Sequence, residues 1–259
     1  MEDGTEVGMV ERFINDGFVT LAVAVPRATI ERCTQLLWEQ IGLDPHDRSG
    51  WTEPVRWVGG MTHQAFVDAM NAPALIDACD RLAGPGRWRP RASMGSFPLR
   101  FPHETEPDDA GWHVETSFLP EGATTWHLNL QSKDRALLAL FLFTDVDDED
   151  GPTRIRVGSH RDIPALLEPY GERGVSGMRF GPQAAAASAH RHATLATGDA
   201  GDVFVCHPFL VHAAQPNHGS RPRFLGQPGV PAGQPYRWDR PDEDCSPVEL
   251  TIKHALRTG

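Results

Sequence analysis

Residues 111–118 read GWHVETSF and residues 203–224 read VFVCHPFLVHAAQPNHGSRPRF, and these two stretches decide the predicted fold. Side chains of a β-strand point alternately to opposite faces, so a strand through the first stretch places His113 and Glu115 on one face. The second stretch contributes His212. Two histidines and one carboxylate form a set that holds a metal while leaving other coordination positions open. We therefore predict a metal centre whose open side accepts small ligands.

The second stretch also predicts a hairpin that brings an arginine to the metal. The cluster PNHGS favours a turn at residues 217–218. With that turn, Arg223 falls opposite His212, and directly opposed residues have Cβ atoms roughly 4.5–5.5 Å apart. The guanidinium of Arg223 would then reach past the metal and bind the far carboxylate of a keto acid.

Nearby histidines and arginines compete for these roles. His207 is the alternative second histidine ligand, and Arg221 is the alternative arginine. In the hairpin register Arg221 faces Ala214, further from the metal, and we interpret His207 as a residue at a strand end. His160 and His218 lie in turn-like sequence, which favours a surface or structural role over metal binding.

The rest of the chain predicts helices first and many short strands after them. A nearly continuous apolar run at residues 136–143 predicts a buried central strand. Residues 171–194 receive no assignment. This order of elements fits a mainly β fold with flanking helices, a double-stranded β-helix (jelly roll, cupin-like) with an N-terminal helical layer. A chain of 259 residues is compatible with a single domain over residues 1–259. We expect helices at 6–15, 26–41, 64–70, 74–82 and 247–256.

Two less regular segments are candidates for contacts with a substrate. Residues 42–60 are rich in proline, glycine and tryptophan, which predicts a long ordered loop. Its Trp51 and Trp57 either cover a substrate or anchor the loop to the core. Residues 226–241 are expected to be irregular and to fold over the mouth of the barrel.

Polar side chains on the predicted strands leave further alternatives open. Asn129 lies on the polar face of a predicted strand, and it hydrogen-bonds the co-substrate if that face lines the barrel. If the face meets solvent, Asn129 has no special role. Arg154 and Arg156 share one face of another strand, which we expect to be an outer face.

A group of arginines before the first stretch also has two interpretations. Arg87, Arg89 and Arg91 alternate in the sequence. Arg100 follows in a predicted strand at residues 96–101. These side chains either supply a basic group to an acidic substrate or form a solvated strand face.

Composition narrows the class of partner. The chain has 24 Lys and Arg against 35 Asp and Glu, a net charge of −11, which argues against nucleic acid because such binding relies on basic side chains. Four widely spaced cysteines are typical of reduced thiols. The N-terminal sequence has no basic region followed by an apolar one, and no apolar run reaches membrane-spanning length. We expect a cytoplasmic protein without a membrane partner.

Several motifs together resemble the phytanoyl-CoA dioxygenase family of Fe(II)/2-oxoglutarate oxygenases. They are the His-Val-Glu motif at 113–115, GPTRIRVGSH at 151–160, GDVFVCHP and its continuation at 201–223, and VERFINDGF at 10–18. The resemblance covers most of the chain and implies the same fold as above. One residue departs from the family's usual His-x-Asp pattern, because the carboxylate here is Glu115, whose extra methylene shifts its oxygens relative to the strand.

The resemblance implies roles for the residues and a class of reaction. His113, Glu115 and His212 would bind Fe(II), and Arg223 would bind the distal carboxylate of 2-oxoglutarate. With O₂ as a further partner, such an enzyme hydroxylates a small-molecule substrate, and desaturation or ring formation uses the same machinery.

Two other classes of protein remain open at this point. One is a zinc-dependent hydrolase, because two histidines and a glutamate also bind zinc. Arg223 argues against a hydrolase, since hydrolysis does not require an arginine that binds a keto acid. The other is a catalytically silent jelly-roll binding module.

Overall fold

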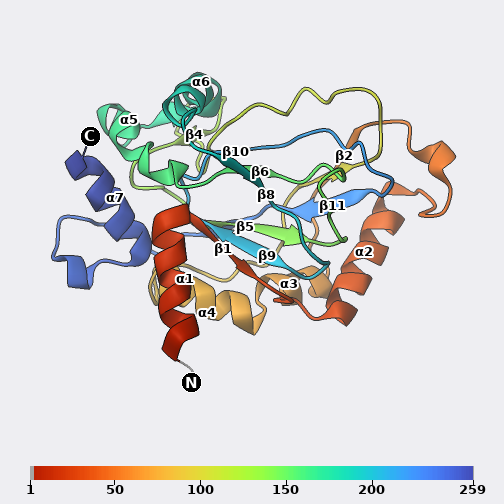
Figure 1. The fold of residues 1–259 in the computed structure, drawn as a ribbon, viewed down its shortest axis with the longest axis horizontal. Coiled ribbons are helices and arrows are strands. Elements are labelled where there is room, and N and C mark those ends of the chain that lie inside the picture. Colours follow the sequence, from red (N-terminus) through yellow and green to blue (C-terminus); the bar gives the residue numbers. More distant parts are fainter. Residues whose placement is uncertain (1–2, 259) are drawn as a thin grey trace.

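The computed structural model describes residues 3–258 and shows two antiparallel sheets stacked on each other, with helices around them (Figure 1). The larger sheet runs in the order β1 (Phe18–Leu21), β9 (Val203–Cys206), β5 (Arg135–Leu142), β11 (Arg223–Gly226), β3 (Phe97–Arg100) and β2 (Val55–Val58), with β12 (Gly229–Pro231) also paired to β5. The smaller sheet runs β10 (His212–Ala213), β6 (Arg154–Arg156) and β8 (Ala193–Leu195), and β4 (His127–Leu128) pairs separately with β7 (Val175–Ser176). The predicted double-stranded β-helix is confirmed.

The central strand β5 joins the two layers of the core. It is buried along its whole length. Leu138 and Leu140 share a core cluster with Ile155 of the smaller sheet. Phe141, on the opposite face, belongs to the cluster formed with the helices. A strand covered on both faces needs apolar side chains on both, which explains the continuous apolar run, and the prediction at 136–143 is confirmed.

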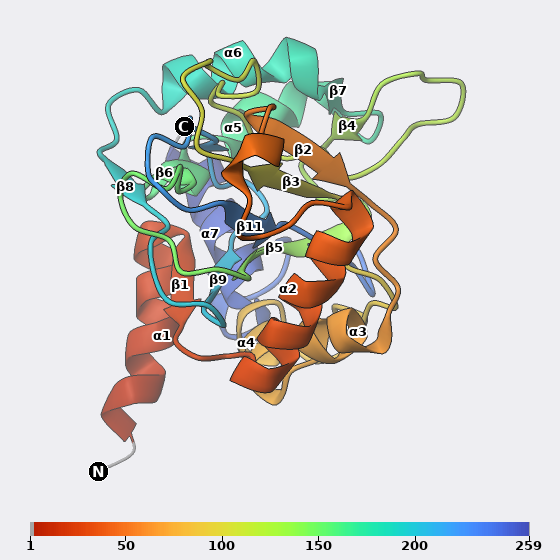
Figure 2. The same ribbon diagram turned by 90° about the vertical axis from the view of Figure 1, so that its right-hand side faces the viewer.

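Helices cover the outer face of the larger sheet. Figure 2 shows α2, α3 and α4 together on one side of the molecule and α6 on the opposite side. Ile30 and Leu37 of α2 and Leu75 of α4 pack in the same cluster as Phe141. The α-helices are α1 (Asp3–Asp16), α2 (Arg27–Ile41), α3 (Gln64–Met70), α4 (Pro73–Leu82), α5 (Pro164–Leu167), α6 (Gly177–Ala187) and α7 (Pro247–Thr258). Short 3₁₀ helices span Arg48–Gly50, Ser159–Arg161, Glu168–Tyr170 and Asp242–Asp244.

The predicted end of the first helix is confirmed, and its cause is visible. Gly17 has φ +83°, and its amide donates to the carbonyl of Phe13 at 2.9 Å. Glycine adopts this left-handed conformation without the steric cost that a side chain brings. The site is also tight, because a Cβ on Gly17 would lie 2.4 Å from Nδ1 of His160.

Three segments differ from the sequence predictions, and a fourth, which had no assignment, forms regular structure. The unassigned residues 171–194 contain α6 and most of β8. The predicted loop at 42–60 contains β2, which pairs with β3, and the predicted irregular segment at 226–241 contains β12, which pairs with β5. The predicted strand at 125–131 is reduced to the two residues of β4. For β2, β4 and β12 a neighbouring strand, rather than local sequence, decides whether the segment pairs.

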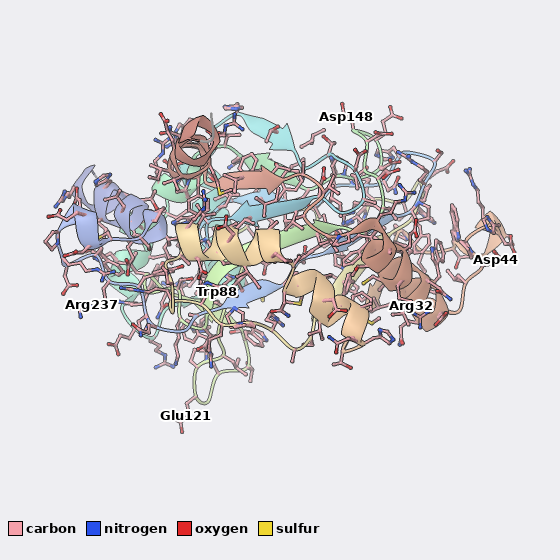
Figure 3. All side chains as sticks on the ribbon, turned by 90° about the horizontal axis from the view of Figure 1, so that it is seen from below. Arg32, Asp44, Trp88, Glu121, Asp148 and Arg237 are labelled. Atoms are coloured by element: carbon pink, nitrogen blue, oxygen red, sulfur yellow. The ribbon has the colours of Figure 1, made fainter. Side chains whose placement is uncertain are left out.

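The tryptophans of residues 42–60 differ in their surroundings. The Trp51 ring packs on Trp38, with ring centroids 6.3 Å apart, so it anchors the segment to α2. Trp57 is exposed on β2, and its role as a substrate cover stays a prediction. Figure 3 shows two projecting loops. One has Asp44 near its end. The other has Glu121 at its tip and connects the first stretch to β4.

The cysteines are free thiols, as predicted. Cys33, Cys79 and Cys206 are buried, and burial raises the pKa of Cys33 and of Cys79 to about 12. Within residues 3–258, no helix is both long enough and apolar enough to cross a membrane.

Candidate metal centre

The structure brings His113, Glu115 and His212 together. Each offers one ligand atom, and these atoms all lie within 4.8 Å of one another. Oε1 of Glu115 is 3.5 Å from Nε2 of His113 and 3.7 Å from Nε2 of His212. Metal bonds of about 2.0–2.2 Å to imidazole and carboxylate put neighbouring ligand atoms roughly 3–3.5 Å apart. The three side chains therefore fit one ion with a small adjustment.

The two histidines face each other across a β-bridge between the two stretches. The amide of His113 donates to the carbonyl of His212 at 2.9 Å, and the reverse bond is 3.0 Å. Their ring centroids are 4.5 Å apart. The first stretch makes bridges at His113 and at Phe118 rather than the continuous strand predicted. The His-x-Glu alternation still holds, because both side chains point toward His212.

Both imidazoles are oriented by the same local contact. Nδ1 of His113 lies 2.8 Å from the carbonyl of Gly111, and Nδ1 of His212 lies 3.0 Å from that of Leu210. A carbonyl oxygen can only accept, so each Nδ1 carries the proton and each Nε2 presents a lone pair toward Glu115. Nε2 of His212 is buried and finds no hydrogen-bond partner among the described residues. A metal ion would supply the partner that this atom lacks.

The electrostatics favour the metal-binding forms of two of the ligands. Burial acts against the charge of Glu115, but the closeness of both imidazoles outweighs burial and holds the pKa of Glu115 well below the usual range. Burial and the positive charge of His113 lower the pKa of His212. For His113, burial is outweighed by Glu115, and its pKa is raised. A carboxylate and a neutral imidazole are the forms that bind metal.

The ligands differ in their exposure to solvent. The side chain of His212 is 5% exposed, whereas those of His113 and Glu115 are 37% and 26% exposed. The centre is therefore closed behind His212 and open on the side of the first stretch.

Arg135 holds both metal-bearing stretches from the larger sheet. Its buried guanidinium donates to the carbonyls of Glu115 at 2.7 Å, Thr116 at 3.0 Å and Pro208 at 3.0 Å. Burial lowers its pKa to about 10 against the opposing charge of Glu115, so it is still a cation at neutral pH. The sequence predictions missed this residue. The available signal was a charged side chain directly before a continuous apolar strand.

Arg154 and Arg156 hold the same region from the smaller sheet. Arg154 donates to the carbonyl of Ala110 at 2.7 Å, directly before the first stretch, and to that of Ala214 at 2.8 Å in the second. Its guanidinium carbon is 4.9 Å from the ring centroid of Trp112, and that of Arg156 is 4.3 Å away. The two arginines share a face as predicted. Ile155 between them packs against Leu138 and Leu140 of the larger sheet, so this face points away from that sheet, and Trp112 covers it.

The predicted hairpin between His212 and Arg223 was wrong. His212 of β10 pairs with Ile155 in the smaller sheet, and Arg223 of β11 pairs with Arg100 in the larger sheet. The PNHGS cluster crosses from one sheet to the other instead of forming a tight turn. Asn217 is buried there, and its amide donates to the carbonyl of Arg221 at 2.7 Å.

Arg223 nevertheless has the surroundings expected of a ligand-binding arginine. Its side chain is 1% exposed, and its nearest polar contact is 3.4 Å from Nη1 to the Thr153 hydroxyl. Burial and then the charge of Arg100 lower the pKa of Arg223 to about 9. Its rival Arg221 is half-exposed and forms ion pairs with Asp147 and Asp150.

The competing histidines have structural contacts. His207 follows β9 directly, as predicted for a strand-end residue, and its Nδ1 accepts from the amide of Phe209 at 3.1 Å. Its Nε2 therefore donates to the Thr251 hydroxyl at 3.0 Å. His160 is buried beside it, with ring centroids 4.8 Å apart, and His218 is exposed at the surface.

Asn129 is engaged by the backbone. Its amide nitrogen donates to the carbonyl of Glu172 at 3.0 Å, and its oxygen accepts from the amide of Lys133 at 3.0 Å. It lines a hollow of about 520 Å³ together with Arg89 and Lys133. These contacts stabilise the turn that follows β4, and the role of Asn129 toward a co-substrate stays a prediction.

The other arginines of the sequence prediction have partners within the fold. Arg87 pairs with the buried Glu249, and Arg91 donates to the carbonyl of Gly229 at 2.7 Å.

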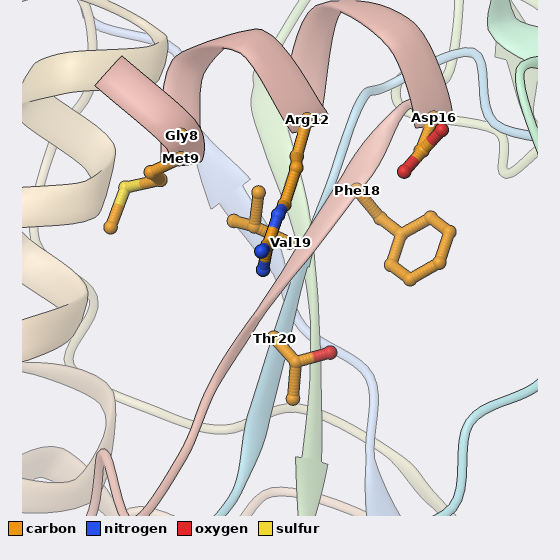
Figure 4. A pocket seen from close by; sticks show the side chains of 7 residues that line it. All are labelled: Gly8, Met9, Arg12, Asp16, Phe18, Val19 and Thr20. Atoms are coloured by element: carbon orange, nitrogen blue, oxygen red, sulfur yellow. The ribbon is translucent and has the colours of Figure 1, made fainter. Parts of the chain in front are cut away.

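Another hollow, of about 670 Å³, is lined by residues of α1 and β1 such as Arg12 and Phe18 (Figure 4). Its lining residues all lie between Gly8 and Thr20, so they include none of the candidate metal ligands.

Comparisons with known proteins agree with this geometry. A model of the family described as phytanoyl-CoA dioxygenase (PhyH) matches residues 48–225. Curated proteins give no match. Three solved structures share the fold at low sequence identity. The non-heme alpha ketoglutarate dependent epimerase SnoN from nogalamycin biosynthesis has a TM-score of 0.55 at 18% identity, over 87% of this chain and 82% of that one.

The carbocyclase SnoK from nogalamycin biosynthesis has a TM-score of 0.53 at 18% identity, over 87% of this chain and 83% of that one. HygX from Streptomyces hygroscopicus, solved with nickel, 2-oxoglutarate and hygromycin B bound, has a TM-score of 0.53 at 15% identity, over 85% of this chain and 84% of that one. At such identities these likenesses establish the fold, and function has to be argued from the site.

Proposed function

Because the chain belongs to the phytanoyl-CoA dioxygenase family, we propose that it is a non-heme Fe(II)- and 2-oxoglutarate-dependent dioxygenase acting on a small molecule. The observation that carries the proposal is the orientation of the two imidazoles. Their Nδ1 protons are held by main-chain carbonyls, and both Nε2 atoms meet the Glu115 carboxylate, so the site is a preformed 2-His-1-carboxylate set.

Each residue has a defined task in this proposal. His113, Glu115 and His212 hold the iron, which supplies the activation of O₂ when bound. Arg223 binds the distal carboxylate of 2-oxoglutarate. Arg135 fixes the backbone around Glu115, and the buried position of His212 excludes water from one side of the centre. The protein thus binds, orients and shields the reacting groups.

Hydroxylation of an unactivated C–H bond is the reaction we propose. Structures of the same fold include an epimerase and a carbocyclase, so the fold is compatible with other outcomes of the same oxidative chemistry. The choice among them depends on where the substrate places its C–H bond relative to the metal, and product analysis with a turned-over substrate distinguishes them.

The first test is anaerobic titration of the apo-protein with Fe(II) and then 2-oxoglutarate. The weak visible charge-transfer band of the metal–keto acid complex reports binding. We expect the band in the parent and none in Glu115→Ala. Arg223→Ala should need about a hundredfold more 2-oxoglutarate, because removing one member of a buried charge pair costs about 2–5 kcal/mol.

The matched control is Arg221→Ala, which removes the same charge from an exposed position two residues away and should leave the midpoint unchanged. A parent protein that gives no band and binds zinc tightly would contradict the oxygenase and favour the zinc-dependent hydrolase. One that binds neither metal would be a silent jelly-roll module.

A further inference from the structure

A second buried arginine lies beside Arg223. Arg100 of β3 and Arg223 of β11 are directly paired across the larger sheet, so their side chains share one face. Both side chains are 1% exposed. Two like charges that are buried next to each other destabilise a fold unless an anion compensates for them. A negative charge beside the guanidinium groups of Arg100 and Arg223 would therefore stabilise them.

The fold supplies only part of that charge. Nη2 of Arg100 donates to Oδ2 of Asp109 at 2.5 Å. Within residues 3–258, Nε and Nη1 of Arg100, Nε of Arg223 and Oδ1 of Asp109 are buried without a hydrogen-bond partner. Two guanidiniums and one carboxylate sum to +2 − 1 = +1. Buried donors without partners are costly, so this group has both the charge and the free donors to take one more carboxylate.

Asp109 also lies close to the metal centre. It precedes His113 by four residues, and its charge acts on the pKa of His113 as well as on that of Arg223. Its side chain is 29% exposed, so it can move away from Arg100 without unpacking the core. Arg100 and Arg223, by contrast, are fixed in the ladder of the larger sheet.

We propose that Arg100 is a second arginine of the co-substrate pocket and that Asp109 is its counter-ion while the pocket is empty. When 2-oxoglutarate binds, its distal carboxylate replaces Asp109 as the partner of Arg100. The inference rests on the proposed function, since it assigns Arg223 to the same carboxylate. When the co-substrate is bound, the group sums to +2 − 2 = 0. Asp109 competes with the co-substrate, so removing its charge tightens binding, whereas a salt bridge with a purely structural role gives no such gain.

The test is the anaerobic charge-transfer titration of the Fe(II)-loaded full chain with two keto acids. 2-Oxoglutarate carries the distal carboxylate and pyruvate lacks it. We expect Asp109→Asn to lower the dissociation constant of 2-oxoglutarate at least threefold and to leave that of pyruvate unchanged. Asp108→Asn, which removes the same charge from the exposed neighbouring residue, should change neither constant.

A charge-compensated double variant keeps the test valid if Asp109→Asn folds poorly. In Arg100→Met, Asp109 is left to pair with Arg223, so 2-oxoglutarate should bind at least tenfold more weakly. Adding Asp109→Asn removes the competitor and should recover most of that loss. Because both partners of the pair are then absent, the double variant leaves neither Arg100 nor Asp109 without its partner, and the buried charge of Arg223 stays available to 2-oxoglutarate.

The outcomes separate this inference from the proposed function. A parent that binds Fe(II) but shows no band with 2-oxoglutarate contradicts the proposed function. A parent that shows the band while Asp109→Asn binds 2-oxoglutarate equally or more weakly contradicts the role of Asp109. Equal changes for both keto acids, or a double variant no better than Arg100→Met, also overturn the inference.

Discussion

The larger and the smaller sheet are stabilised in different ways. In the larger sheet, β5 is buried over its whole length and pairs with β9 and β11 through regular ladders. In the smaller sheet, β10 has two residues, and the adjoining first stretch makes isolated bridges. Guanidinium groups bonded to main-chain carbonyls replace the missing ladder there. Apolar burial thus builds the scaffold, while a few buried cations position the metal ligands.

The largest effect is expected from a change confined to the scaffold. Phe141→Ala removes a buried ring between β5 and the helices and should lower the free energy of unfolding by about 3–5 kcal/mol. Metal affinity of the folded protein should be unchanged, because Phe141 faces away from the smaller sheet. Denaturant unfolding and a metal titration at low temperature check the two parts. Thr20→Ala, at an exposed position of β1, is the control and should change neither.

A change in one positioning arginine should affect both properties. Arg135→Met leaves three main-chain carbonyls, one of them fully buried, without their donor and should cost about 3 kcal/mol of unfolding free energy. Outer contacts of metal ligands are worth about 10–100-fold in metal affinity, so binding should weaken by at least about tenfold. Competition with a chromophoric chelator measures it. Arg135→Lys should recover part of the loss, and an unchanged metal affinity in Arg135→Met would contradict the positioning role.

The buried His160 predicts a loss of stability in mild acid that originates away from the metal. Burial, assisted by the charges of Arg161 and Arg191, lowers its pKa to about 3 in the folded chain, against about 6.5 in an unfolded one. Above pH 6.5 both states are neutral. Below pH 6.5 this histidine binds a proton in the unfolded chain but not in the folded chain. The free energy of unfolding therefore decreases as the pH is lowered to about 3.

Between pH 7 and pH 5 this histidine alone should remove about 2 kcal/mol. Unfolding curves at both pH values measure the loss, and His160→Gln should be less sensitive to pH over the same interval. An equal sensitivity in the variant would assign the effect to other groups, of which the neighbouring His207 is the first candidate, because burial holds its pKa well below the usual value.

The smallest effect is expected from the aromatic contact of the smaller sheet. Trp112→Leu removes the ring that lies against Arg154 and Arg156 and should cost about 1 kcal/mol. Metal affinity should fall a few-fold, since Trp112 adjoins His113. Trp126→Leu replaces an exposed tryptophan and should leave both quantities unchanged. Equal behaviour of the two variants would show that the stacking has no energetic role.

Local sequence predicted the scaffold well. The apolar run of β5 is long enough to identify a buried strand, and α2 and α3 have the predicted bounds within a residue. The His-x-Glu alternation also placed two candidate ligands on one side of the chain, because side-chain direction in extended backbone depends on local geometry alone.

Partnership between strands could not be predicted in the same way. The turn-like PNHGS cluster is compatible both with a hairpin and with a crossing between sheets, and the buried Asn217 decides in favour of the crossing only through its contacts in the folded chain. Arg135 and Asp109 escaped notice for a related reason. Arg135 donates to carbonyls 19, 20 and 73 residues away in the sequence, and Asp109 pairs with Arg100 nine residues away. Neither spacing follows the period of a helix or a strand, so periodicity carries no information about these contacts.

The unequal exposure of the three candidate ligands has a consequence for how a metal would be supplied. His212 is 5% exposed, but His113 is 37% exposed, so an ion held at this centre can be exchanged through the open side while the fold stays intact. Chelators in a purification buffer would then empty the centre without denaturing the protein. Divalent ions that bind nitrogen and oxygen ligands more strongly than Fe(II) would displace it. The identity of the bound metal would therefore depend on the concentrations of free metal ions around the protein as much as on its sequence.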